Sequence, residues 1–213
     1  YPLKPCSLQG PALAMDVDVF DEEGNSIKGG IGHLVCKKPA PSMTKSFLND
    51  DERYLDTYFS TYEGVWYHGD WAHIDEDGFW FLHGRSDDTI KIAGKRTGPA
   101  EIESAVNEHD KVQESAAIGV PHDIKGESVV TFVVLKPGVE PGEELREELS
   151  KMVVDKLGKT MKPEKMLFIK ALPKTRSGKI VRGSIKKKFL GKDPGDMSSV
   201  ENPDAIEGIS QAE

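Results

Sequence analysis

The chain has 213 residues, 37% of them hydrophobic and 30% charged, which is the composition of a globular protein with one large domain or two small ones. Its formal net charge of −8 argues against a nucleic-acid-binding protein. No apolar run approaches the roughly 20 residues that span a bilayer, and the first residues lack the basic and apolar parts of a signal peptide. Two cysteines, Cys6 and Cys36, are too few for a disulfide framework or a zinc site. We therefore expect a cytoplasmic protein with reduced thiols, no membrane span and no metal site.

The first part of the chain has the patterning of β-structure. Residues 15–20 and 32–37 alternate apolar and polar side chains on either side of a turn, which predicts a hairpin. Residues 50–60 have the aromatic spacing of a short helix. Two aromatic-rich strands within 66–85 flank an Asp-Gly turn, and 89–98 reads as a tighter hairpin with a glycine in its turn.

From Pro99 onwards the pattern mixes helices and strands. Pro99 stands where a first helical turn tolerates proline, and the apolar residues that follow it share one face. The expected elements are a helix at 99–109, strands at 114–120 and 128–138, a helix at 142–157, a strand at 165–172 and a helix at 178–190. The chain is therefore predicted to be of the α+β class, with a domain boundary near residues 84–88.

Charge is unevenly distributed along the second half of the chain. Residues 159–192 are rich in Lys and Arg and contain one acid, Glu164, whereas residues 193–213 contain acids and no base. A basic segment on an acidic protein suggests a local anionic ligand such as a nucleotide or a coenzyme phosphate. A solvated basic helix face around residues 185–189 explains the same composition, so both interpretations stay open.

Two stretches resemble a known family. Residues 67–106, YHGDWAHIDEDGFWFLHGRSDDTIKIAGKRTGPAEIESAV, and residues 172–183, LPKTRSGKIVRG, are similar to motifs of the adenylate-forming enzymes, in particular the AMP-forming acetyl-CoA synthetases. The similarity runs from about Pro11 to Leu190, and residues 52–70 resemble the acetate and propionate branch. Several motifs in family order are a stronger signal than a single glycine pattern.

The resemblance implies a division of the chain into three parts. Residues 1–86 would be the β-rich end of a large adenylating domain, residues 87–192 a mobile α+β C-terminal domain, and residues 193–213 an acidic tail. The family's Ser/Thr/Gly-rich phosphate loop and most of its acyl pocket are not found in these 213 residues. We therefore expect the C-terminal part of a larger enzyme, inactive alone, whose partner is the missing N-terminal part; a separately encoded paralogue is the alternative.

The implied reaction has two halves, both with small-molecule substrates. A short-chain carboxylate attacks the α-phosphate of ATP, with Mg²⁺ on the nucleotide, and gives acyl-AMP and pyrophosphate. The thiol of coenzyme A then attacks the acyl carbonyl and releases AMP. Because the first half brings two anions together, it needs a cation between them.

Lys179 is the catalytic candidate for that cation. Its compact ammonium can contact the carboxylate and an α-phosphate oxygen together, and Pro173 and Gly178 shape the loop that carries it. A surface lysine after a turn is the ordinary explanation of Ser-Gly-Lys alone. A G-x-x-x-x-G-K-[ST] nucleotide loop is excluded, because Ile180 stands where Ser or Thr would bind Mg²⁺. Acylation of Lys179 by a lysine acyltransferase would remove its charge.

Four further positions match nucleotide-contacting or hinge residues of the family. The resemblance implies that Asp70 and Arg85 hydrogen-bond the ribose hydroxyls and that Arg96 approaches the nucleotide phosphate. Asp87 matches the hinge between the domains, where a few loop residues absorb large backbone changes. Without the resemblance, a turn-forming aspartate and a surface ion pair would be the ordinary explanations of Asp70 and Arg85.

Ala93 and Gly94 match the face that lines the passage for the pantetheine arm of coenzyme A once the small domain has rotated. Gly94 also fits a tight turn, and the two roles are compatible. The sequence departs from acetate-type enzymes at Val154, which stands about where they carry a coenzyme-contacting arginine; Lys156 or Lys159 is a candidate substitute.

Two rival interpretations stay open. One is a non-catalytic interaction or regulatory module that keeps the fold, and the other is an adenylating domain that serves a carrier protein instead of free coenzyme A. A Ser/Thr/Gly-Lys loop encoded upstream would argue against the first. A dedicated carrier-protein partner would favour the second.

Overall fold

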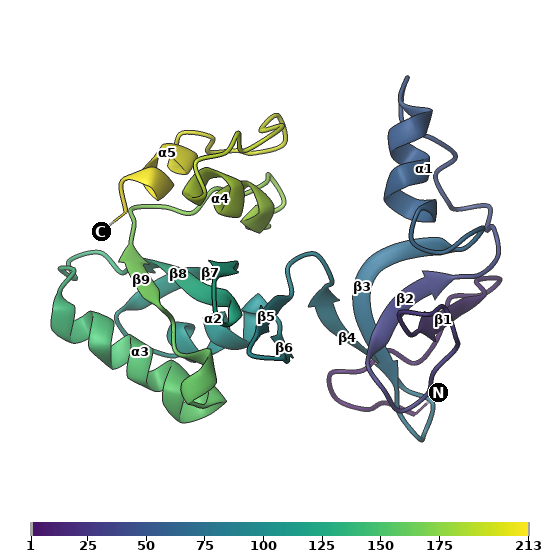
Figure 1. Ribbon diagram of the computed structural model, residues 1–213, viewed down its shortest axis with the longest axis horizontal. Helices are drawn as coiled ribbons and strands as arrows, with labels where there is room; N and C mark the ends of the chain where they lie inside the picture. Colours follow the sequence, from purple (N-terminus) through teal and green to yellow (C-terminus); the bar gives the residue numbers. More distant parts are fainter. Residues whose placement is uncertain (1, 213) are drawn as a thin grey trace. The chain divides into compact units, whose positions relative to one another are not determined.

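The computed structural model describes residues 2–212, which fold into two compact units that divide between Asp87 and Asp88 (Figure 1). Each unit combines a sheet with one or more helices, so the predicted α+β class is confirmed. No helix in the described part of the chain is both long enough and apolar enough to cross a membrane.

The first unit is built on an antiparallel sheet in the order β1-β2-β3-β4. Its elements are β1 (Val17–Phe20), β2 (Gly32–Cys36), α1 (Asp51–Phe59), β3 (Trp66–Ile74) and β4 (Trp80–Arg85). In the turn between β3 and β4, the Asp75 carboxylate accepts a hydrogen bond from the main-chain N–H of Phe79 at 2.9 Å, and Gly78 takes φ +86°. The two predicted hairpins and the short helix are present.

The core of the first unit is largely aromatic. One cluster contains Phe20 and Val35 packed with Tyr62, whose ring meets the Phe20 ring edge to face at 5.5 Å. The Tyr62 hydroxyl donates to the main-chain oxygen of Asp21 at 2.6 Å. Burial raises the pKa of Tyr62 to about 12, because the charged phenolate is disfavoured away from water.

The second unit has a sheet in the order β6-β5-β8-β7, with β9 running parallel to β8. Its strands are β5 (Ile90–Ile92), β6 (Lys95–Thr97), β7 (Val112–His122), β8 (Gly126–Leu135) and β9 (Lys165–Phe168). Its helices are α2 (Pro99–Asn107), α3 (Glu143–Leu157), the short 3₁₀ turn η1 (Lys159–Met161), α4 (Arg182–Phe189) and α5 (Ala205–Ser210).

Both faces of the second sheet are covered by helices. Helices α2 and α3 lie on one face, and α4 and α5 lie on the other (Figure 1). Ile102 of α2 and Leu149 of α3 belong to one buried cluster, and Ile185 of α4 and Ile209 of α5 belong to another. Because β7 and β8 supply side chains to both clusters, long runs of each strand are buried rather than alternating with exposed residues.

The structure differs from the sequence interpretation at three places near the C-terminal end. The strand expected at 165–172 already ends at Phe168. The helix expected at 178–190 begins only at Arg182, because Lys174 and Ile180 pair as a β-bridge and Gly178, at φ +80°, turns the chain between them. The stretch 193–213 is acidic, as its composition says, yet Val200, Ile206 and Ile209 are buried, and the last two pack in one cluster with Ile185 of α4 and side chains of the sheet.

Candidate functional site

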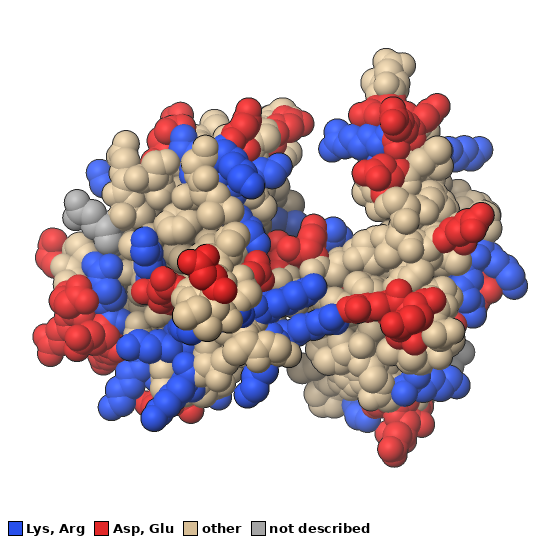
Figure 2. Space-filling view, viewed as in Figure 1, with Lys and Arg blue, Asp and Glu red and all other residues tan. Residues whose placement is uncertain are grey.

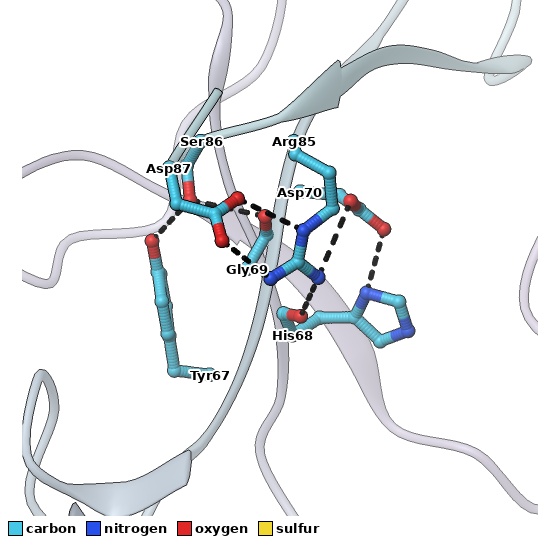
Figure 3. A network of polar contacts seen from close by, with 7 residues as sticks. All are labelled: Tyr67, His68, Gly69, Asp70, Arg85, Ser86 and Asp87. Atoms are coloured by element: carbon cyan, nitrogen blue, oxygen red, sulfur yellow. Dashed lines mark hydrogen bonds and ion pairs between the residues drawn. The ribbon is translucent and has the colours of Figure 1, made fainter. Parts of the chain in front are cut away.

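In the first unit, Asp70 and Arg85 face each other across neighbouring strands. They are register partners in β3 and β4, next to an irregularity of the pairing between Asp70 and Ala72. The Asp70 carboxylate lies 2.8 Å from Nδ1 of His68 and 3.8 Å from a guanidinium nitrogen of Arg85, and the Asp70 side chain is 18% exposed (Figure 3). A partly buried carboxylate with nearby donors is suited to accept hydrogen bonds from hydroxyl groups.

Arg85 also binds the last residue of the first unit. Its Nε donates to Oδ1 of Asp87 at 3.0 Å, and its Nη2 donates to Oδ2 at 3.2 Å (Figure 3). Nη1 donates to the main-chain oxygen of His68 at 3.2 Å. This two-pronged pairing has the planar geometry that arginine and carboxylate groups favour.

The guanidinium lies against Gly69, whose positive φ would strain any other L-residue. Gly69 has φ +85°, and a Cβ there would lie 2.9 Å from Nη2 of Arg85. The main-chain oxygen of Gly69 accepts from both the N–H and the hydroxyl of Ser86, at 2.9 and 3.0 Å, and the Tyr67 hydroxyl contacts the Ser86 hydroxyl (Figure 3). These contacts fix the main chain directly before Asp87.

In the second unit, Ala93 and Gly94 form the two-residue turn between β5 and β6. Both have positive φ, +48° and +79°, as a turn of this kind requires. The Ala93 N–H donates to the main-chain oxygen of Lys125 at 2.9 Å, which ties the turn to the start of β8. A Cβ at Gly94 would meet no atom within 4 Å, so its outer side is open space within this unit.

Arg96 follows on β6, opposite Lys91 of β5, and is exposed. Lys95 beside it is exposed as well, whereas Thr97 is buried. The hairpin therefore holds Arg96 on an edge strand of the sheet, two residues beyond the open turn.

Lys179 lies on a second tight loop. The main-chain oxygen of Lys179 accepts from the Thr175 N–H at 2.9 Å, the Thr175 oxygen accepts from the Gly178 N–H at 2.8 Å, and the Thr175 hydroxyl accepts from the Lys179 N–H at 3.2 Å. The Lys179 side chain is exposed, and within residues 2–212 its ammonium has no hydrogen-bond or ion-pair partner. A rigid main chain thus carries a free cation.

Several neighbouring cations are neutralised by carboxylates from other parts of the second unit. The pairs are Lys174 with Glu114, Arg182 with Glu103, Lys186 with Glu127 and Lys188 with Glu207. The contact with Glu103 raises the pKa of the Arg182 guanidinium above its ordinary value. Figure 2 shows basic side chains lying beside acidic ones on the visible face. Several cations of the basic segment are therefore held in ion pairs within the unit and are not simply solvated. The exposed Lys179 ammonium is not in such a pair.

The predicted site residues fall into two groups. The structure brings Asp70, Arg85 and Asp87 into one network, and it places Gly94 and Lys179 on separate hairpin loops of the second unit. Sequence reasoning missed the supporting residues of the network, namely Tyr67, His68, Gly69 and Ser86, although the first three precede Asp70 in the motif YHGD. No group of three or more His, Cys, Asp or Glu side chains that could hold a metal ion occurs among the described residues.

Comparison with protein families finds one match. The family described as AMP-binding enzyme C-terminal domain matches residues 101–179, which begin in α2 and end at Lys179. Residues 101–179 are thus similar to an AMP-binding enzyme C-terminal domain.

Curated relatives resemble the chain over almost all of its length. Acetyl-coenzyme A synthetase of Methanothrix thermoacetophila is 45% identical and covers 98% of this chain, and that of Pyrobaculum aerophilum is 44% identical and covers 99%. In both cases the chain covers 32% of the relative. The chain thus spans about a third of the length of the curated relatives that it matches.

Solved structures of larger enzymes contain a region that resembles both units of this chain. Acetoacetyl-CoA synthetase from Streptomyces lividans matches with a TM-score of 0.84 and 31% identity, covering 97% of this chain and 32% of that one. An ATP-bound RpMatB-BxBclM chimera matches with a TM-score of 0.73 and 32% identity, covering 87% of this chain and 36% of that one. The resemblance predicted from the motifs is confirmed over nearly the whole chain. The roles of individual residues stay predictions.

Proposed function

We propose that the chain is part of an AMP-forming acetate–CoA ligase, which converts ATP, acetate and coenzyme A into acetyl-CoA, AMP and pyrophosphate. The observation that carries this proposal is the 45% identity to an acetyl-coenzyme A synthetase over nearly the whole chain. The enzyme acts in the cytoplasm on small molecules, with Mg²⁺ entering on the nucleotide.

In the first half-reaction, Lys179 offsets the repulsion between acetate and the α-phosphate of ATP. Support comes from its exposed ammonium, which has no protein partner among the described residues, and from the hydrogen-bonded loop that carries it. A preorganised cation stabilises charge that builds up in the transition state without first having to reorient.

The network of the first unit binds the ribose of the nucleotide. Asp70 accepts hydrogen bonds from the ribose hydroxyls, Arg85 lies beside it, and Arg96 approaches the phosphate. The 3.8 Å separation of the Arg85 and Asp70 side chains supports a shared role. Asp87 acts as the hinge, and its place at the division between the two compact units supports that assignment.

In the second half-reaction, the Ala93–Gly94 turn lines the path of the coenzyme A arm. The absence of any atom within 4 Å of a Cβ at Gly94 supports a close approach of ligand there. A lysine acyltransferase that acylates Lys179 would switch off the first half-reaction, and the exposure of Lys179 supports access to it.

The test is acetate-dependent exchange of pyrophosphate into ATP by the full-length protein, followed by thioester formation with free coenzyme A. We expect exchange with acetate, weaker exchange with longer acids, none without acid, and none by the 213-residue chain alone. Exchange without transfer to free coenzyme A would indicate a carrier-protein substrate. No exchange with any short-chain acid would refute the proposed function.

A further inference from the structure

The base of the Lys179 loop is held by a side chain from the acidic stretch near the C-terminal end. Oδ1 of Asn202 accepts a hydrogen bond from the Lys174 N–H at 2.9 Å, and Nδ2 of Asn202 donates to the main-chain oxygen of Leu172 at 2.9 Å. These two partners fix the orientation of the amide, because the reverse orientation would place oxygen against oxygen and N–H against N–H. Asn202 therefore bridges the main chain on either side of Pro173.

The residues before Asn202 extend the same contact. The Glu201 N–H donates to the main-chain oxygen of Lys174 at 2.8 Å, and Val200 pairs with Thr175 as a β-bridge. Three consecutive residues thus line the start of the loop in the manner of an added strand, with Asn202 as the member that contributes its side chain.

We call residues 200–202 the clamp; the segment that contains it is anchored by buried side chains. Ile206 and Ile209 are 5% and 2% exposed, because they pack into the cluster that covers this face of the sheet. Val200 is 8% exposed and pairs with Thr175 as a β-bridge. The segment that the clamp contacts, directly before the loop, is buried too, since Leu172 is 1% exposed. In contrast, residues 176–179, which form the turn and the position directly after it, are exposed, so the loop has a fixed base and an accessible Lys179 side chain.

We propose that Asn202 is a positioning residue for adenylate formation, because it fixes the base of loop 173–181 and so presents the Lys179 ammonium at a defined place. This inference rests on the proposed function of Lys179. Without the bridge the loop samples more conformations, and a smaller fraction of molecules holds the cation in the productive geometry. Asn202 lies beyond residues 101–179, which the family model matches.

Limited proteolysis with trypsin reports the mobility of the loop independently of the protein's own activity. Trypsin cleaves after Lys and Arg, and the loop contains Lys174, Arg176 and Lys179. In Asn202→Ala we expect cleavage at these three sites, followed by mass spectrometry, to be at least about tenfold faster than in the wild-type chain. Glu207→Gln, which removes an exposed ion pair of the same tail, is the matched control and should leave loop cleavage unchanged. Asn202→Asp keeps an acceptor for the Lys174 N–H and should lie between wild type and Ala. Unchanged cleavage in Asn202→Ala would overturn the clamp.

The catalytic readout separates positioning from folding. In the full-length enzyme, Asn202→Ala should lower kcat of acetate-dependent exchange about tenfold while the KM for ATP and thioester formation from preformed acetyl-adenylate stay within about twofold. Asn202→Asp should restore part of the exchange rate. Equal loss in both half-reactions would show a merely structural contact, and a looser loop with unchanged exchange would show that the clamp positions nothing. If the wild-type enzyme makes no adenylate, the proposed function fails and the positioning role falls with it, while the trypsin result still decides whether Asn202 holds the loop.

Discussion

Gly94 combines a backbone requirement that the structure shows with the ligand-contacting role that we propose for it. Its φ of +79° suits the turn between β5 and β6, and a side chain would point into open space. An L-residue there carries a conformational cost whatever its size, whereas only a large side chain would obstruct a ligand. The two roles therefore respond differently to substitution.

We predict that Gly94→Ala and Gly94→Leu lower stability by a similar amount, on the order of 1 kcal/mol, because both place an L-residue at positive φ. In the full-length enzyme only the Leu variant should cripple thioester formation, and both should keep adenylate formation near normal. Thermal unfolding and separate assays of the half-reactions measure this. Equal losses of both half-reactions in Gly94→Leu would show that Gly94 is simply structural.

Tyr62 offers a residue-level test of the first unit's core. Its pKa, raised by burial to about 12 from an ordinary value of 10.0, favours the protonated phenol in the folded state. Its contribution to stability is therefore complete below pH 10 and is lost as the pH rises toward 12. An absorbance titration at the tyrosinate band should show a late ionisation that Tyr62→Phe removes. A titration curve unchanged by that substitution would contradict the buried assignment.

At the scale of elements, Glu103 joins three parts of the second unit. It lies in α2 and is 7% exposed, it accepts from the Ala117 N–H of β7 at 2.9 Å, and it pairs with Arg182 at the start of α4 through contacts of 2.8 and 2.6 Å. Arg182 in turn follows the Lys179 loop directly, so this pair anchors the loop's far end.

We predict that Glu103→Ala destabilises the second unit by roughly 3–5 kcal/mol, since removing one partner leaves the other charge partly buried and unpaired. The control Glu207→Ala removes an exposed pair with Lys188 and should cost less than about 1 kcal/mol. Urea unfolding of the two variants beside the wild-type chain measures both values. Similar small losses in the two variants would mean that the Glu103 pair does not hold α4 in place.

Among the helices and strands, the sequence predicted best those with strong hydrophobic periodicity. It predicted the hairpins of the first unit and the α3 helix, because alternating and helical patterns mark which faces must be buried. It set the start of α4 too early, because the bridge between Lys174 and Ile180 depends on pairing that no local pattern encodes. It treated residues 193–213 by charge alone and missed the three buried apolar side chains that dock them.

The candidate site was predictable to a different degree. The motifs identified Lys179, Asp70, Arg85 and Gly94, because each of these residues has a fixed place within a short motif that the family shares. Motifs do not reveal which side chains meet in space, so the Arg85 contact with Asp87 and the Asn202 bridge emerged only from the folded main chain. Supporting contacts of this kind depend on strand register and on chain segments far apart in sequence.

At the scale of the whole molecule, the two half-reactions are proposed to depend on two different loops of the second unit. The proposed role of the Lys179 loop is in adenylate formation and that of the Ala93–Gly94 turn is in thioester formation, and Asp87 is the last residue of the first unit. If the two loops act in separate half-reactions, a substitution on the Lys179 loop should slow adenylate formation alone. A substitution in the Ala93–Gly94 turn should slow thioester formation alone.

The decisive measurement is Lys179→Ala in the full-length enzyme, with each half-reaction assayed separately. Losing one preorganised contact of this kind costs on the order of 3–4 kcal/mol, so acetate-dependent exchange should fall roughly 10²–10³-fold or more. Lys179→Arg should rescue poorly because its planar fork is bulkier than a compact ammonium, and Arg176→Ala on the same loop is the matched control for local effects.

Supplying preformed acetyl-adenylate bypasses the first half-reaction. With it, Lys179→Ala should form acetyl-CoA at close to the wild-type rate, because the cation is no longer needed between two anions. If the variant keeps full exchange activity, or fails equally when given the adenylate, the role assigned to Lys179 is wrong.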